Sequence, residues 1–316
     1  MQRVHFRFII RGLALCTALC LFFCKSNYPP ERAQTADRLE SEGRGNEPQR
    51  IICAAPSVTE IVFALGFGDK VVGVSDFSVS PPEAKAKTKV GGLINPNREK
   101  IATLNPDLLI LQGQNDSLAR LCEELDIRFL SVAIDSLEDI RRAIFLIGTE
   151  LGADAKAEEI VSRIQDDLRS IQERARLLPQ RRVFISLGHT PGDLTGLMTT
   201  GSGTFIHELV TMAGGDNIFK DASGLYPQIS KESLVKRRPE VILEAIPGML
   251  GEDKQRLLRK DWSQLPMLPA FRSGRIHFLT EDYLLIPGVR IAQILLRFAK
   301  AIHPEVFGES NDTRAQ

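Results

Sequence analysis

The sequence has no excess of charge of either sign. Its 316 residues include 40 Lys and Arg and 40 Asp and Glu. A protein that binds DNA or RNA needs a basic surface to meet the phosphates, so this balance argues against a nucleic-acid partner. The composition, with 43% hydrophobic and 25% charged residues, is that of a globular protein long enough for two domains.

Several motifs that carry chemistry are also missing. Neither G-x-G-x-x-G nor the P-loop pattern follows an apolar segment, which weakens a nucleotide-binding interpretation. G-x-S-x-G is absent, since residues 201–203 form a GSG turn without that pattern, and a secreted hydrolase is therefore a weaker alternative. No H-E-x-x-H or paired-cysteine zinc spacing occurs. We assign no catalytic residue, resident metal or cofactor.

Cysteine is scarce beyond the first 24 residues. Of the five cysteines, Cys16, Cys20 and Cys24 lie in that segment, and only Cys53 and Cys122 remain. Export would permit a disulfide, but Cys53 falls in a predicted strand and Cys122 in a predicted helix of the same half. We expect two free, partly buried thiols.

Basic residues and an apolar run mark the N-terminus. Arg3, Arg7 and Arg11 precede the uncharged residues 12–23. This run is too short to span a membrane stably, so we predict a secretory signal over residues 1–24, with an uncleaved anchor as the alternative. Residues 25–49, rich in Glu, Arg, Pro, Ser and Gly, are predicted to be a disordered tether, and residues 305–316 a flexible tail.

The end of the apolar run resembles a bacterial lipoprotein signal, in which the cysteine after the run is lipidated. Leu21 stands three residues before Cys24, although Phe23 occupies the place of a usually small residue, and Cys20 is a rival site. The resemblance implies lipidation at Cys24 and a periplasmic protein anchored to a membrane.

Two stretches of the chain are similar to one another. Residues 97–111 read NREKIATLNPDLLIL, and residues 230–244 read SKESLVKRRPEVILE. With an offset of 133 residues, Glu99 aligns with Glu232 and the two prolines align as well. Each copy predicts a short helix, a proline that ends it and a buried strand. The pattern indicates two related halves.

Strands alternate with helices in both halves, which predicts parallel, doubly wound sheets. We expect an α/β fold of two Rossmann-like lobes, residues 50–153 and 180–304. Residues 154–178 contain neither Pro nor Gly and carry apolar residues three or four apart. They predict one long amphipathic helix, about 36 Å at 1.5 Å per residue, that joins the lobes. Packing within one lobe is the alternative.

Local patterns add three expectations. Ligands of parallel sheets lie beyond the carboxyl ends of the strands, here residues 75–78, 91–95 and 112–116. Residues 57–60, SVTE, fit a capping box that opens a helix. Trp262, the only tryptophan, falls in an amphipathic segment and is predicted to be core.

Several short motifs follow one another between residue 50 and residue 304. They include 56–60 (PSVTE), 72–75 (VGVS), 97–101 (NREKI), 203–206 (GTFI), 226–230 (YPQIS) and 287–291 (PGVRI). Their order resembles the substrate-binding protein of a bacterial ABC importer, in the class that carries vitamin B12, haem or ferric siderophores. The cobalamin-binding members are the most similar. The resemblance implies a non-enzymatic monomer that captures cobalamin or a related corrinoid between two lobes and delivers it to a permease dimer with its ATPase.

The resemblance also implies a set of binding residues. In the cobalamin binders, aromatic side chains of both lobes pack on the flat corrin. In those proteins, tryptophan is usual at two of the matching positions. This chain has Leu93 and Tyr226 there instead, so neither position holds a tryptophan. Ordinary core or loop packing is the alternative for each position. The matching residues are Phe77, Leu93, His189, Tyr226 and Tyr283, with Arg290 as a further candidate.

Other ligands stay open. His189 and Tyr226 are residue types that ligate haem iron. A ferric siderophore would need several arginines, for which Arg290 alone is thin support. A first-row metal ion would need about three His or carboxylate ligands, and only His189 is suitably placed.

The acidic residues of the repeat are candidates for docking. Glu99 and Glu232 match the positions at which such proteins present one acid per lobe to arginines of the permease. The alternative is that both acids simply favour a helix N-terminus, where the helix dipole stabilises them by about 0.3–1 kcal/mol.

Overall fold

The computed structural model describes residues 47–92, 94–248 and 252–308. The predicted signal, Cys24, most of the tether, Leu93 and the end of the tail lie outside the described residues. None of the described helices is long and apolar enough to cross a membrane.

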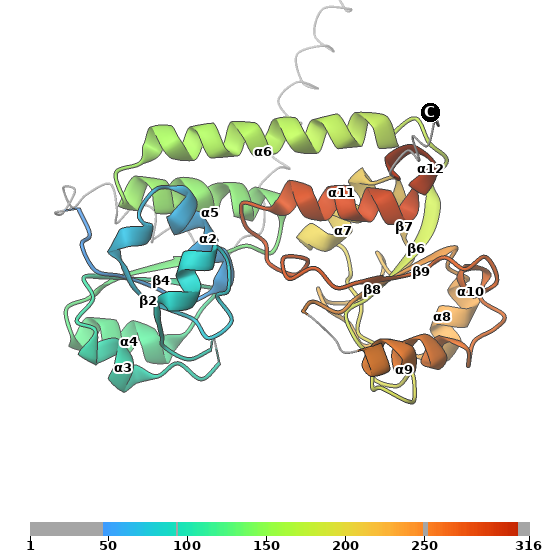
Figure 1. Cartoon of the computed structure of the whole chain (residues 1–316), viewed down its shortest axis with the longest axis horizontal. Helices are drawn as coiled ribbons and strands as arrows, with labels where there is room; N and C mark the ends of the chain where they lie inside the picture. The colour runs from blue at the N-terminus through green and yellow to red at the C-terminus, as the bar shows by residue number, and fades with distance from the viewer. Residues whose placement is uncertain (1–46, 93, 249–251, 309–316) are drawn as a thin grey trace, which may run out of the picture. The chain divides into compact units, whose positions relative to one another are not determined.

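Each half is built around a parallel sheet (Figure 1). The first sheet has the strand order β3-β2-β1-β4-β5, and the second has the order β7-β6-β8-β9. Every strand pair in both sheets is parallel. The predicted α/β class with two parallel sheets is confirmed. The strands are β1 Ile51–Cys53, β2 Val71–Val74, β3 Thr88–Lys89, β4 Leu108–Gln112, β5 Arg128–Val132, β6 Arg181–Ser186, β7 Gly215–Asn217, β8 Val241–Ala245 and β9 Ile276–Leu279.

Helices cover both faces of each sheet. The helices of the first half are α2 Pro56–Ala64, α3 Arg98–Thr103, α4 Asp116–Glu124 and α5 Leu137–Glu150, with short 3-10 turns at Gly68–Lys70 and Pro82–Ala86. The second half carries α7 Phe205–Met212, α8 Lys231–Arg237, α9 Glu252–Trp262, α10 Pro269–Arg272, α11 Ile291–Ile302 and α12 Pro304–Phe307.

Between the two sheets in the sequence runs the long helix α6, Asp154–Ala175. Its 22 residues span about 33 Å at 1.5 Å per residue. It packs against α5 of the first half and against α7 and α11 of the second, as Figure 1 shows. The prediction of a single long helix that contacts both halves is confirmed. The helix ends three residues earlier than expected.

One hydrophobic core runs beneath this helix. It joins side chains of β1 and β4 to side chains of β6 and β8 through the buried faces of α2, α5, α6, α7 and α11. The other face of each sheet packs separately, against α3 and α4 in the first half and against α8, α9 and α10 in the second. Trp262 is buried in the latter cluster, as predicted.

The two copies of the repeat fold alike. Asn105 follows α3 and Arg238 follows α8, and both have left-handed backbones, with φ of 44° and 48°. One residue later, a proline starts the approach to the next strand. The matching backbones place Glu99 and Glu232 at equivalent points of the two halves.

An acidic residue after each proline fixes the beginning of two strands. The Asp107 carboxylate accepts a hydrogen bond from the Arg50 backbone N–H at 3.0 Å, before β1. The Glu240 carboxylate accepts one from the Arg182 N–H at 2.8 Å, within β6. The sequence similarity is therefore matched by the same local hydrogen bond in both halves.

The predicted capping box at residues 57–60 is wrong. Helix α2 begins at Pro56, two residues before the start that a box with Ser57 as N-cap implies, and its N-cap Ala55 makes no side-chain cap. Proline is favoured at the first helical position because it has no N–H to satisfy. The side chains of the expected box have other partners. Thr59 donates to the Ala55 carbonyl, and Glu60 binds Arg290 from the second half of the chain.

Cys53 and Cys122 are free, as predicted, and they are fully buried where partial burial was expected. Burial raises the pKa of both, that of Cys122 to about 11. The thiolate is the reactive form of cysteine, so neither side chain is a nucleophile in the folded protein.

Candidate functional site

Buried hydroxyls hold the loop that follows β2. The Ser78 hydroxyl lies 2.9 Å from that of Ser75 and 2.8 Å from that of Thr59. Lys89 donates to the Ser78 carbonyl at 2.6 Å. On this fixed loop the side chain of Phe77 is 69% exposed. A large aromatic side chain held in solvent by a braced backbone is suited to binding a ligand.

A second loop of the first half supports the same residue. Asp76 and Gly91 exchange two hydrogen bonds, from the Asp76 N–H to the Gly91 carbonyl and from the Gly91 N–H to the Asp76 carboxylate, both 3.0 Å. A Cβ at Gly92 would lie 3.2 Å from the Phe77 ring, so the glycine lets the ring pack closely. Ile94, next to the undescribed Leu93, is almost wholly exposed. The predicted segments 75–78 and 91–95 are thus neighbours.

The second half offers Tyr226, which is 41% exposed. Its loop is fixed by backbone hydrogen bonds on both sides, from Gly201 N–H to the Leu225 carbonyl at 2.9 Å and from Thr199 N–H to the Pro227 carbonyl at 3.0 Å. Burial, and then the charge of Asp135, raise the pKa of the phenol. Asp135 follows β5 of the first half, so Tyr226 lies within electrostatic reach of that half.

Tyr283 and Arg290 form a unit in the second half. The guanidinium lies over the Tyr283 ring, 5.1 Å from its centroid. It also binds Asp282 at 3.1 Å and Glu60 of α2 at 2.5 and 3.0 Å. Two carboxylates therefore already neutralise Arg290, which leaves it little to offer an anionic ligand.

Glu99 and Glu232 both face solvent. Each lies in the first turn of a short helix whose N-cap side chain accepts a backbone hydrogen bond, Asn97 in α3 and Ser230 in α8. A capped helix start orders the backbone that carries the acidic side chain. The two acids are accessible to a partner, and what they bind stays a prediction.

A comparison with models of protein families assigns the chain to a family. The profile described as periplasmic binding protein matches residues 51–283. The chain belongs to this family.

The chain is similar both to known sequences and to a solved structure. It is 31% identical, over 83% of its own length and 82% of the relative's, to an uncharacterized ABC transporter substrate-binding lipoprotein of Bacillus subtilis strain 168. It is 27% identical to a vitamin B12-binding protein of Vibrio parahaemolyticus, over 79% of this chain and 88% of the relative. A periplasmic heme binding protein from Pseudomonas aeruginosa has a similar structure, with a TM-score of 0.72 and 27% identity over 82% of this chain and 94% of that chain.

In this periplasmic binding protein, His189 is not available to a ligand. Its side chain is fully buried, with Nδ1 3.2 Å from the Glu244 carboxylate and Nε2 3.2 Å from that of Asp261. Its ring meets the edge of Trp262 at 5.9 Å between centroids. Both ring nitrogens are engaged, so axial ligation of haem iron would require breaking one of these contacts.

Sequence reasoning missed the two carboxylates around His189. Glu244 is fully buried in β8, and Asp261 stands near the end of α9. The available signal was an acidic residue inside the apolar run VILEA, because a buried carboxylate needs a partner. Across the part of the chain that the structure describes, no three His, Cys, Asp or Glu side chains are grouped to hold a metal ion.

The paired carboxylates make the stability contributed by His189 depend on pH. Burial lowers the pKa of the imidazole, but Glu244 and Asp261 together raise it above the ordinary value. A raised folded-state pKa means that the contribution is complete below the unfolded pKa, about 6.5, and is lost as pH rises through the folded value.

We therefore expect His189→Asn to lower the free energy of unfolding by about 3–5 kcal/mol at pH 6, because it leaves two buried carboxylates without a cation. The loss should shrink as pH rises toward 9. Urea unfolding of both proteins across this range measures it. His277→Asn is the control. Burial, Arg297 and Arg275 lower the pKa of His277, so the stability change in this variant should depend on pH in the opposite direction. A loss for His189→Asn that grows with pH would contradict the assignment.

Proposed function

We propose that this protein is the substrate-binding component of an ABC importer, and that it captures cobalamin or a related corrinoid between its two halves. The observation that carries the proposal is a pair of exposed aromatic side chains, Phe77 and Tyr226, each on a loop braced by hydrogen bonds and each from a different half. The similarity to vitamin B12-binding proteins supports it.

A corrin suits such a site because it is a large, flat macrocycle. Aromatic side chains cover the faces of a flat ligand with much contact area and lose little rotamer freedom. Leu93 and Tyr283 would extend the same surface, and Arg290 would support Tyr283 from behind. No step in this capture makes or breaks a covalent bond, so we propose a binding protein and not an enzyme.

Haem is the second candidate. The phenol of Tyr226 is a residue type that ligates haem iron, and it is exposed. The similarity in structure to a heme-binding protein favours the same ligand. A ferric siderophore has less support, because Arg290 is already bound to Glu60 and Asp282.

Delivery of the ligand would use the two acids of the repeat. We propose that Glu99 and Glu232 bind arginines of the permease dimer, which works with its ATPase, and that the binding protein acts as a monomer. A lipid on Cys24 would hold it at the membrane. The related lipoprotein of Bacillus subtilis supports the anchor.

Tyr226→Ala should weaken the binding of cyanocobalamin by about 1–3 kcal/mol, or about 5- to 150-fold in Kd, because it removes a stacked aromatic anchor. Tyr226→Phe keeps the ring and removes the oxygen. It should therefore retain cobalamin affinity, whereas it should abolish a tyrosinate-ligated haem spectrum. Spectral titration with cyanocobalamin and with haemin separates the two ligands. An unchanged Kd for Tyr226→Ala with both ligands removes Tyr226 from the site.

Charge reversal at both docking acids, Glu99→Arg with Glu232→Arg, should abolish uptake of cobalamin by cells while ligand affinity stays nearly intact. Like charges would then face one another across the contact with the permease. Glu123→Arg, at an exposed position of α4, is the control and should leave uptake unchanged. Lost ligand affinity in the double variant would contradict a role confined to docking.

Cys24→Ser should release the protein from the membrane fraction into the soluble fraction, because it removes the proposed lipidation site. Cell fractionation and immunoblotting measure the distribution, with Cys20→Ser as the matched variant. Continued membrane association of Cys24→Ser, together with release of Cys20→Ser, would assign the lipid to Cys20.

A further inference from the structure

A bidentate ion pair joins the two halves of the molecule. The Glu60 carboxylate, from the middle of α2, accepts hydrogen bonds from Nε and Nη2 of Arg290, which directly precedes α11. The partners are 230 residues apart in the sequence. Their side chains are 3% and 18% exposed, so the pair is largely shielded from water. A bidentate arginine–carboxylate contact fixes orientation as well as distance.

A second set of polar contacts joins the halves at the helix starts. The Phe205 N–H, at the beginning of α7, donates to the Asp135 carbonyl at 2.6 Å. In return, the Glu208 carboxylate accepts from the Leu137 N–H, at the beginning of α5, at 2.7 Å. Each half thus satisfies an N–H that the other half's helix leaves without an intrahelical partner.

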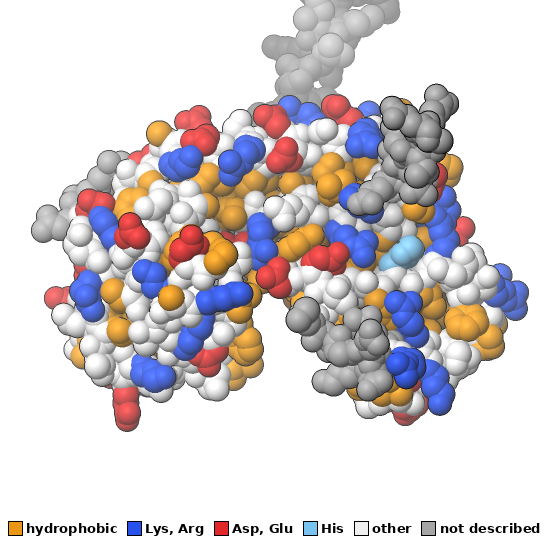
Figure 2. All heavy atoms as spheres, viewed as in Figure 1, with side chains coloured by type: hydrophobic (Ala, Val, Ile, Leu, Met, Phe, Trp, Pro, Cys, Tyr) orange, Lys and Arg blue, Asp and Glu red, His pale blue; other side chains and the backbone are white. Residues whose placement is uncertain are grey.

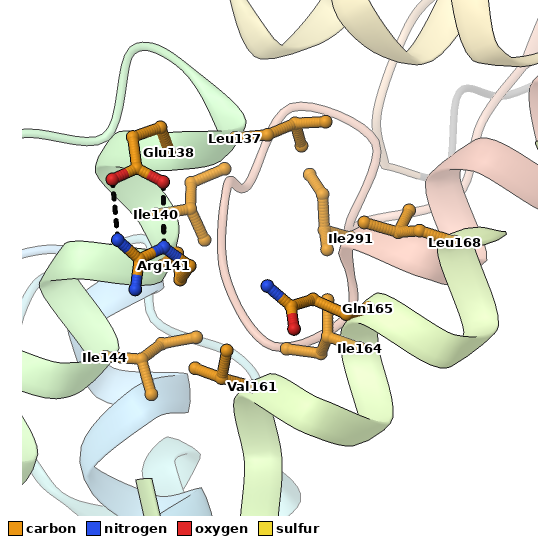
Figure 3. Close-up of a pocket in the computed structure, with 10 residues that line it drawn as sticks. All are labelled: Leu137, Glu138, Ile140, Arg141, Ile144, Val161, Ile164, Gln165, Leu168 and Ile291. Atoms are coloured by element: carbon orange, nitrogen blue, oxygen red, sulfur yellow. Dashed lines mark hydrogen bonds and ion pairs between the residues drawn. The ribbon is translucent and has the colours of Figure 1, made fainter. Parts of the chain in front are cut away.

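Two hollows in the molecular surface lie beside this junction. The first hollow has a volume of about 160 Å³. In Figure 3, Ile291 of α11 lies opposite Ile140 of α5 and beside Ile164 and Leu168 of α6. A second hollow, of about 400 Å³, is lined by Glu60 and Arg290 themselves together with Phe63 and Val289. Both hollows open to solvent, whereas Ile291, Ile164 and Ile140 are buried in the shared core. Apolar packing has no direction, so the orientation of the halves depends on the directional polar contacts.

The ion pair is poorly suited to a purely stabilising role. Burial raises the pKa of the Glu60 carboxyl even though Arg290 acts in the opposite direction. Burial lowers the pKa of Arg290, but Glu60 and Asp282 together raise it above its ordinary value. Desolvation and attraction thus oppose one another, and the net stabilisation from a buried ion pair is often small. What such a pair supplies is a defined geometry between the groups that carry it.

We propose that Glu60 and Arg290 are positioning residues that set the spacing of the two lobes and hold Tyr283 in place for the ligand. Arg290 connects the two halves to the ligand-binding residue Tyr283. One edge of its guanidinium binds Glu60 of the first half, and its face covers the Tyr283 ring. Loss of the pair lets the lobes sample more separations, and fewer molecules then present both ligand-binding surfaces at the right distance. The role in binding rests on the proposed function, whereas the spacing does not.

The spacing is measured with spin labels on Glu123→Cys in α4 and Lys236→Cys in α8, both exposed positions. The labels are placed in the full chain with Cys16, Cys20 and Cys24 replaced by serine. The buried Cys53 and Cys122 stay unlabelled because their thiols are protonated. The variants are Glu60→Gln, Arg290→Gln and the double substitution. Glu150→Gln is the control, because it removes an ion pair with Arg128 inside the first half.

We expect broader distance distributions for both single variants and no further broadening in the double variant, because the two residues act through one contact. The Glu150→Gln distribution should match the wild type. Single variants with wild-type distributions, or a double variant that broadens as the sum of the singles, overturn the proposal. Should Arg290→Gln fail to fold, the isosteric Glu60→Gln decides.

Titration with cyanocobalamin and haemin gives the second measurement. If the competent fraction falls to about one tenth in Glu60→Gln, the Kd rises about tenfold, whereas Glu150→Gln leaves it unchanged. Equal Kd values for Glu60→Gln and the wild type overturn the role in ligand binding. Failure of the wild type to bind either probe counts against the proposed function, while the distance measurement, which needs no ligand, still decides the spacing.

Discussion

The shared hydrophobic core beneath α6 is the constraint on which the rest of this protein depends. Ile160, Ile164 and Leu168 of one helix belong to the same buried cluster as the central strands of both sheets. Separating the halves would expose this apolar surface to water, at about 25 cal/mol for each Å². The loops at the carboxyl ends of the strands are thereby carried on a common support, and side chains far apart in the sequence can serve one ligand.

Buried charged residues fix the relative position of helices and strands, which the apolar core alone does not determine. The Glu60–Arg290 pair and the cluster of His189, Glu244 and Asp261 each connect elements that are distant in the chain. Hydrophobic contact has no direction, so a core alone tolerates small shifts between the parts that form it. A hydrogen-bonded ion pair does not tolerate such shifts, because they would leave a buried charge without its partner. The Glu60–Arg290 pair and the His189 cluster thus fix the relative position of the elements that carry them.

Patterns that act over a few residues made much of the fold predictable. Alternating strands and helices predicted both parallel sheets, the absence of Pro and Gly predicted α6, and the repeat predicted equivalent places for Glu99 and Glu232. The partners of His189 and Arg290 were not predictable in this way, because they lie 55, 72 and 230 residues away. The capping box failed because Pro56 opens the helix. Glu60 therefore lies in the middle of α2, where its partner is the distant Arg290.

The exposure of Phe77 and Tyr226 is a property of the site that sequence patterns do not predict, although they predict the fold around it. Periodicity assigns a loop position to both residues and says nothing about whether their rings are covered. Hydrogen bonds among Thr59, Ser75 and Ser78 hold the loop on which the Phe77 ring is exposed. Such a network depends on three side chains from two segments, and only a structure brings them together.

The burial of the two thiols has a consequence for the redox chemistry of the folded chain. Cys53 belongs to the core beneath α6, whereas Cys122 belongs to the cluster on the opposite face of the first sheet. The sheet itself separates the sulfur atoms, so a cross-link between them requires that the first half be unfolded. Oxidation can therefore link Cys53 to Cys122 only in chains in which the first half has lost its structure.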